Sequence, residues 1–213
     1  MQTYSIRSGS PSDSGNDRIT DKVAFFGYGS LVNELTLSKK YDIQSGKIQN
    51  WKREWKHCVD TTFGRVCALT ASRIEDALID GVFIRCNEIE LKQFDEREIG
   101  YDRMGIARSD VVYSSGPLPD RLYIYTSGPE HYRVGDFYYP IWLSYVEVVM
   151  YGYLMMFGEA GVDRFIQSTE GWSAPIIDDR QNPRYPRFTK ISDEHRRLIE
   201  TWLHSICEVK LYL

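Results

Sequence analysis

The sequence predicts an α+β fold, because segments of strand character come first along the chain and helical segments come later. The alternating order that would indicate a doubly wound parallel sheet does not occur, and there is no internal repeat. A hydrophobic content of 42% with 26% charged residues is typical of a globular protein with a substantial core. We therefore expect residues 21–213 to form a single domain. Residues 1–20 are rich in Ser, Gly, Asp and Asn, so they predict a flexible leader.

Segments with high β-propensity follow one another in the first part of the domain. They are residues 23–26, 44–58, 65–71, 81–86, 104–113 and 122–126. Residues 88–98 interrupt this series with a helical pattern. The expected result is a sheet with one early helix packed against it.

Helices are expected in the C-terminal part of the chain, over residues 143–157, 162–168 and 193–211. Ser192 is a suitable N-cap for the last of them. Between the helices, residues 171–189 contain three prolines and predict an ordered irregular segment. This segment could cap a pocket, form a subunit contact or brace the helices.

Composition excludes several classes of partner. A net charge of −4 gives no electrostatic reason to expect nucleic-acid binding, which needs clustered Lys and Arg. No apolar run approaches the roughly 18 residues that span a bilayer, and the N-terminus lacks the pattern of a signal peptide. The four cysteines, Cys58, Cys67, Cys86 and Cys207, lack the spacing of a zinc site. We expect a cytoplasmic protein that binds neither a membrane nor a metal.

The segment FFGYGSL, residues 25–31, places two glycines and a serine directly after the first strand. It lacks the third glycine of a dinucleotide-binding motif, the lysine of a P-loop and the flanking glycines of a nucleophile elbow. Gly27 and Gly29 free the backbone, so that consecutive N–H groups could point into a cavity and bind a carboxylate or an oxyanion. A simple turn that ends the strand is the alternative.

Glu98 is a candidate general base. In a helix over residues 88–98, Leu91, Phe94 and Glu98 lie on one face, which directs the carboxylate toward the core. Desolvation would raise the pKa of such a carboxyl group and suit it to proton transfer near neutral pH. The alternative is that the helix ends a residue or two earlier and leaves Glu98 in solvent.

FGYGSL and the later DEREIGY together resemble the γ-glutamylcyclotransferase superfamily, most closely its ChaC-like branch. GRVCALT at residues 64–70 and GVFIRC at residues 81–86 are similar, in the same order, to the family's G-R-V-x-x-L and G-V-x-Y-x-L strands. Two features differ from the ChaC-like branch. The tryptophan usual soon after the opening motif is missing, and residues 171–189 have no obvious counterpart.

The resemblance implies a small mixed β-barrel flanked by helices, with a pocket at the end of the first strand. It implies release of 5-oxoproline from a γ-glutamyl amine, dipeptide or glutathione-like peptide, without metal or cofactor. Glu98 matches the family's general acid/base. The residues that match its substrate-binding positions are Tyr28, Gly29, Ser30, Leu31, Tyr101 and Tyr145.

The implied chemistry suits these residues. The substrate's α-amine, with an ordinary pKa of about 8, would lose its proton to Glu98 and attack its own γ-carbonyl. Because nucleophile and electrophile belong to one molecule, the protein chiefly has to hold a reactive conformer. Two alternatives stay open: a non-catalytic small-molecule-binding module with the same pocket, and a different amide-cleaving or transferase reaction on the same fold. The leaving amine and the oligomeric state are not predicted.

Overall fold

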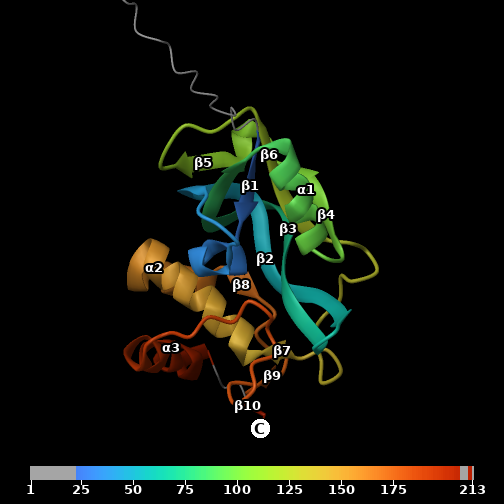
Figure 1. The fold of residues 1–213 in the computed structure, drawn as a ribbon, viewed down its shortest axis with the longest axis vertical. Helices are drawn as coiled ribbons and strands as arrows, with labels where there is room; N and C mark the ends of the chain where they lie inside the picture. Colours follow the sequence, from blue (N-terminus) through green and yellow to red (C-terminus); the bar gives the residue numbers. More distant parts are fainter. Residues whose placement is uncertain (1–22, 207–210, 213) are drawn as a thin grey trace, which may run out of the picture.

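The fold is built around a mixed β-sheet flanked by helices (Figure 1). The computed structural model describes residues 23–206 and 211–212, so the predicted leader over residues 1–20 lies outside the described residues. Within them, seven strands form the main sheet, in the order β4-β6-β1-β3-β2-β5 with β8 paired to β2. Their bounds are Val23–Gly27 (β1), Asp42–Thr61 (β2), Gly64–Cys86 (β3), Tyr101–Gly105 (β4), Val111–Ser114 (β5), Arg121–Ser127 (β6) and Thr169–Glu170 (β8).

The strands β2 and β3 form one long hairpin, with pairs from Asp42 and Arg85 to Thr61 and Gly64 at its tip. The separate strands predicted over residues 65–71 and 81–86 are therefore parts of β3. Most of the residues between them are exposed, and Arg73, Glu75 and Asp76 are charged, which weakened the strand pattern in the sequence. Register shifts, one of them beside Asn50 in a left-handed conformation, bend the hairpin.

The predicted α+β class is confirmed, but the sheet does not close into a barrel. Its end strands are β4, which pairs with β6, and β5, which pairs with β2. The segment predicted as one strand over residues 104–113 instead contains the end of β4 and most of β5. The chain turns through a short 3-10 helix at Arg108–Asp110 and crosses from one edge of the sheet to the other.

The helix α1 (Glu88–Arg97) begins at Asn87, whose side chain accepts hydrogen bonds from the N–H groups of Ile89 and Glu90. The side chain of Glu90 accepts from the Asn87 N–H in return, which completes a capping box. The helix ends at Arg97, and Glu98 is its C-cap residue. It therefore ends one residue earlier than predicted.

The helix α2 (Leu143–Gln167) joins the two helices predicted over residues 143–157 and 162–168, with Gly158 at the kink between them. The helix α3 spans Asp193–Ile206, and the Ser192 hydroxyl accepts a hydrogen bond from the His195 N–H at its start. The prediction that this helix continues to residue 211 is wrong. Leu211–Tyr212 forms β10, whose backbone pairs with β9 (Ile176–Ile177), and β9 in turn pairs with β7 (Ile141–Trp142).

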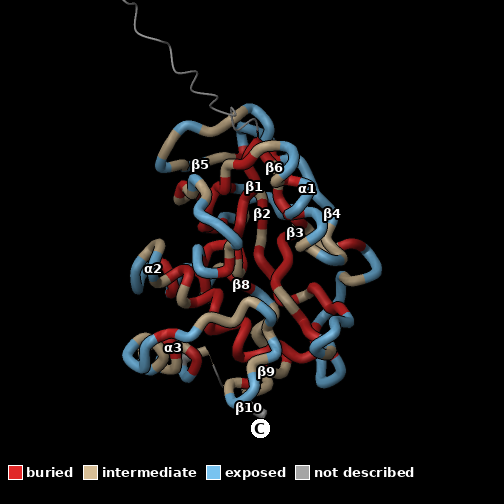
Figure 2. The backbone as a smooth tube through the Cα atoms, in the orientation of Figure 1, coloured by how far each residue is buried: buried red, intermediate tan, exposed pale blue. Residues whose placement is uncertain are grey.

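The core lies between the sheet and α2, and β1 is buried along its whole length (Figure 2). The fully buried Arg53 of β2 fixes the turn that follows β1. Its Nη1 lies 3.3 Å from the carbonyl oxygen of Tyr28 and also donates to the hydroxyl of Tyr153. That hydroxyl lies 3.0 Å from the same carbonyl oxygen. A buried network therefore determines where the FGYGSL turn begins.

Residues 171–189 cross the start of α2. The buried carboxylate of Asp179 accepts hydrogen bonds from the Ser144 N–H at 2.8 Å and the Ser144 hydroxyl at 2.6 Å. It thereby occupies the positive end of the α2 dipole. It also accepts from the Arg184 N–H, which directs residues 185–187 back toward the sheet.

Candidate active site

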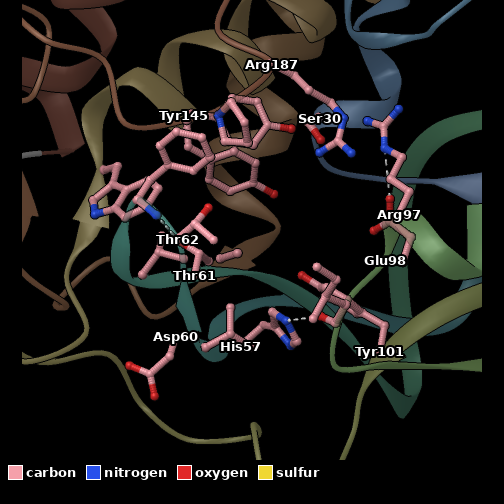
Figure 3. Close-up of a pocket in the computed structure, with 18 of the residues that line it drawn as sticks. Ser30, His57, Asp60, Thr61, Thr62, Arg97, Glu98, Tyr101, Tyr145 and Arg187 are labelled. Atoms are coloured by element: carbon pink, nitrogen blue, oxygen red, sulfur yellow. Dashed lines mark hydrogen bonds and ion pairs between the residues drawn. The ribbon is translucent and has the colours of Figure 1, made fainter.

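A cavity of about 640 Å³ opens between the end of β1, the β2–β3 hairpin, the end of α1 and the start of α2 (Figure 3). Segments far apart in the sequence form its wall. The residues that line it include Ser30, His57, Val59, Thr61, Thr62, Val66, Arg97, Glu98, Tyr101, Trp142, Tyr145, Tyr185 and Arg187.

Glu98 lies in the cavity wall with 17% of its side chain exposed (Figure 3). As the C-cap of α1 it keeps the helical N–H bond to the Phe94 carbonyl, but its backbone leaves the helical conformation. Burial raises the pKa of its carboxyl group, while the guanidinium groups of Arg97 and Arg187 partly oppose that rise. Of the two alternatives for this residue, the earlier helix end is correct, yet the carboxylate is not left in bulk solvent.

The FGYGSL turn reaches the cavity through Ser30. Gly29 lies behind it, and a Cβ atom there would lie 3.0 Å from the Tyr145 hydroxyl, so a larger residue would have to displace that side chain slightly. The side chains of Tyr28 and Leu31 are buried in the core, and the Tyr28 hydroxyl donates to the Tyr125 carbonyl at 2.5 Å. Of the four predicted turn residues, only Ser30 lines the cavity.

Tyr101 lines the cavity and stacks on His57, with ring centroids 3.6 Å apart. Its hydroxyl donates to the Leu69 carbonyl at 2.6 Å. Burial lowers the pKa of His57 to about 3, so its imidazole is neutral at physiological pH. The His57 Nε2 lies 3.2 Å from the Ile99 carbonyl oxygen, which makes this nitrogen the donor. The imidazole thus holds the chain directly after Glu98 and does not compete with it for a proton.

Tyr145 of α2 lines the cavity beside Tyr185, with ring centroids 4.9 Å apart. Burial raises the pKa of both phenols, so both hydroxyls remain protonated and can donate hydrogen bonds. Tyr185 and Arg187 come from residues 171–189, and the sequence did not predict them as site residues. The available signal was the grouping of aromatic and basic residues with prolines in RYPRF, residues 184–188.

Among the described residues, no group of three or more His, Cys, Asp or Glu side chains is placed to hold a metal ion. In the same part of the chain, every helix is too short or too polar to cross a membrane.

No family model and no curated protein matches this sequence. Solved structures do. The fold is similar to a gamma-glutamyl cyclotransferase with a TM-score of 0.51 and 15% identity, over 84% of this chain and 98% of that one. YkqA from Bacillus subtilis matches with a TM-score of 0.50 and 11% identity, over 68% of this chain and 53% of that one. An uncharacterized protein from Homo sapiens matches with a TM-score of 0.49 and 14% identity, over 83% of this chain and 97% of that one.

The similarity to the gamma-glutamyl cyclotransferase covers nearly all of that chain, and it confirms the predicted fold: this protein has a γ-glutamylcyclotransferase-like fold. At 15% identity, this similarity shows the fold alone.

Proposed function

We propose that this protein is a γ-glutamylcyclotransferase that releases 5-oxoproline from a γ-glutamyl amine, dipeptide or glutathione-like peptide. The observation that carries the proposal is the half-buried Glu98, a carboxyl group of raised pKa that opens onto the same cavity as the turn after β1. The shared fold and the ChaC-like sequence motifs support it.

In the proposed reaction, the carboxylate of Glu98 takes a proton from the substrate's α-ammonium group. The free amine attacks the γ-carbonyl carbon of the same molecule, and negative charge develops on the carbonyl oxygen. The turn at Ser30 would donate hydrogen bonds to that oxygen. Protonated Glu98 then returns its proton to the departing amine as the amide bond breaks. No covalent enzyme intermediate forms, so the Ser30 hydroxyl is not a nucleophile.

The charges around Glu98 fit both halves of this cycle. Burial raises the pKa of its carboxyl group toward that of an α-amine, about 8, which eases proton transfer in each direction. The Arg97 Nε lies 3.1 Å from a carboxylate oxygen of Glu98 and favours the ionised form needed at the start. Arg187 stands on the same side of the cavity and would attract the α-carboxylate of the substrate (Figure 3).

The opposite side of the cavity would hold the leaving amine. There the hairpin tip, with Thr61 and Thr62, lies across from Glu98 (Figure 3). The cavity wall next to this tip is apolar, because it contains the buried side chains of Val59, Val66 and Trp142. We therefore expect a leaving amine with an apolar body to bind better than a small or strongly anionic one.

The direct test is a mass-spectrometric assay for 5-oxoproline with a panel of γ-glutamyl compounds. We expect turnover by the unaltered protein and a loss of at least about 100-fold in Glu98→Gln, which keeps the shape but removes the base. Glu96→Gln is the matched control, since Glu96 lines the same cavity from the last turn of α1.

An active Glu98→Gln protein that folds normally would contradict the role of Glu98. If the unaltered protein turns over no member of the panel, the proposed activity is wrong. Thermal stabilisation by 5-oxoproline without turnover would then indicate the non-catalytic binding module.

A further inference from the structure

We propose that Cys58 and Cys67 form a reversible cross-strand disulfide, a redox-active site on the back of the cavity wall. The two residues are direct partners in the β2–β3 register. Both are reduced in this structure. The inference rests on the strand geometry and is independent of the proposed function.

The backbone hydrogen bonds define the type of pair. The Cys58 N–H donates away from β3, to the His131 carbonyl at 2.9 Å. The Cys67 N–H donates away from β2, to the Pro140 carbonyl at 2.8 Å. Cys58 and Cys67 are therefore a non-hydrogen-bonded pair, in which Cα atoms lie about 4.5 Å apart. This separation falls within the range of about 4.4–6.8 Å that disulfides span.

Both thiols lie on the same face of the hairpin, under the same loop. The Cys58 Sγ is 3.4 Å from the carbonyl oxygen of Arg133. Two residues further on, a Cβ atom added to Gly135 would meet the Cys67 Sγ at 2.8 Å. The loop backbone therefore lies directly on the sulfur atoms, and the two sulfur atoms can approach each other without either strand moving to a new register.

The two thiols differ in acidity. The neighbouring Cys67 thiol and the Arg133 guanidinium lower the pKa of Cys58, so Cys58 is the group that becomes a thiolate. The hydrogen bond with Cys58 and burial raise the pKa of Cys67. Such a pair divides the reaction between one nucleophilic sulfur and one resolving thiol.

A hydroperoxide is the oxidant that this pair can use. The Cys58 thiolate attacks the O–O bond, which gives a sulfenic acid and releases an alcohol or water. The Cys67 sulfur then attacks the sulfenic sulfur, the S–S bond forms and water leaves with the thiol proton. The two electrons lost by the sulfur atoms reduce the peroxide, and a dithiol reductant reverses the process.

The cover over the pair is a single loop. Val134 and Phe137 in this loop are 58% and 65% exposed, whereas the Tyr138 ring packs against the guanidinium group of Arg65 on β3, at 3.7 Å. Local opening of such a loop costs less than global unfolding and would admit a small peroxide.

The flanking residues connect this site with the cavity. His57 and Val59 on β2, and Val66 and Ala68 on β3, line the cavity on the opposite face. A disulfide at Cys58 and Cys67 would tie together the two strands that carry them. We expect the oxidised protein to melt at a higher temperature than the reduced one.

The test oxidises the folded, full-length protein with hydrogen peroxide, blocks remaining thiols and maps its tryptic peptides without reduction. Cleavage at Lys56, Arg65 and Arg73 places Cys58 and Cys67 in separate peptides, so their disulfide joins two identifiable fragments. We expect that linked species, its loss after dithiothreitol and its absence in Cys58→Ser and Cys67→Ser.

Cys86→Ser is the matched control, because Cys86 lies elsewhere on β3, opposite Val23, and this variant should still form the link. Oxidation of Cys58 to a sulfinic acid without the link would overturn the proposal. So would a linked species in which either residue pairs with another cysteine, or thiols that react only after unfolding.

Discussion

The Nε of Arg97 lies 3.1 Å from Oε1 of Glu98, so two consecutive residues at the end of α1 form an ion pair inside the cavity. The guanidinium group of Arg97 is fixed from behind, since its Nη1 donates to the Thr36 carbonyl at 3.0 Å. Burial raises the pKa of the Glu98 carboxyl group and so disfavours the ionised form that acts as the base. The adjacent cation counteracts this effect.

Arg97→Gln should therefore shift the pH profile of the reaction. Removing the positive charge disfavours the carboxylate, so the pKa of Glu98 should rise further. The acidic limb of kcat/KM, which reports the base in the free enzyme, should move to higher pH by the same amount. The measurement is the rate of 5-oxoproline release across a pH series. Arg103→Gln is the control, because the Arg103 side chain pairs with Asp95, at 2.7 Å. An acidic limb that stays at the same pH in Arg97→Gln, or moves to lower pH, would contradict the expectation.

Glu147 should make the protein less stable as pH rises. Burial raises the pKa of its carboxyl group to about 7, and its nearest cations, Arg180 and Arg196, are 3.8 and 3.9 Å away. Asp178 and Glu200 also face it and favour the neutral form. The folded protein thus binds this proton more tightly than the unfolded chain does. The resulting stability is complete below the ordinary pKa of 4.5 and is lost as pH rises through 7.

Glu147→Gln should remove this dependence, because the amide stays neutral. Above pH 7 the variant should gain up to about 3 kcal/mol in its free energy of unfolding over the unaltered protein, with little gain in acid. Urea unfolding at about pH 5 and about pH 8 measures the difference. Glu159→Gln, at an exposed position of α2, is the control. A gain that is the same at both pH values would show that titration of Glu147 is not its cause.

Tyr153→Phe should weaken both the core and the site. Loss of the hydroxyl deprives the buried Arg53 of an acceptor and the Tyr28 carbonyl of a donor, at a cost of roughly 1–3 kcal/mol. The turn that carries Ser30 begins at this carbonyl, so kcat/KM should also fall. Chemical denaturation and the 5-oxoproline assay measure the two effects, with Tyr151→Phe as control, since the half-buried Tyr151 of α2 packs beside His195 of α3. A variant as stable as the unaltered protein would show that the network contributes little.

Val66→Thr should change which leaving amine is preferred. The variant places a hydroxyl group in the apolar part of the cavity wall, where we expect the leaving amine to bind. The KM for γ-glutamyl-phenylalanine should rise by roughly tenfold, and the KM for γ-glutamyl-glycine should hardly change. Val112→Thr, at an exposed position of β5, is the control. Equal losses for both substrates would mean that the leaving group does not bind beside Val66.

Several features could be predicted from the sequence because they depend on neighbouring residues. The apolar run of β1, the glycines that follow it and the spacing of Leu91 and Phe94 are local patterns, and the structure forms the corresponding strand, turn and helix. The order of strands and helices was sufficient for the α+β class. Glu98 was selected as a core-facing residue of a helix, and it lies in the cavity wall although the helix ends before it.

Other features depended on which distant segments meet, and only the tertiary structure decided them. The register in which β2 pairs with β3 depends on both strands, so it cannot be predicted from either one alone. This register places Cys58 opposite Cys67. Asp179 returns residues 185–187 to the cavity through its bonds to α2, which brings Arg187 close to Glu98. Local propensity determines the elements, whereas the burial of their apolar faces and the pairing of their polar groups determine which side chains share a cavity.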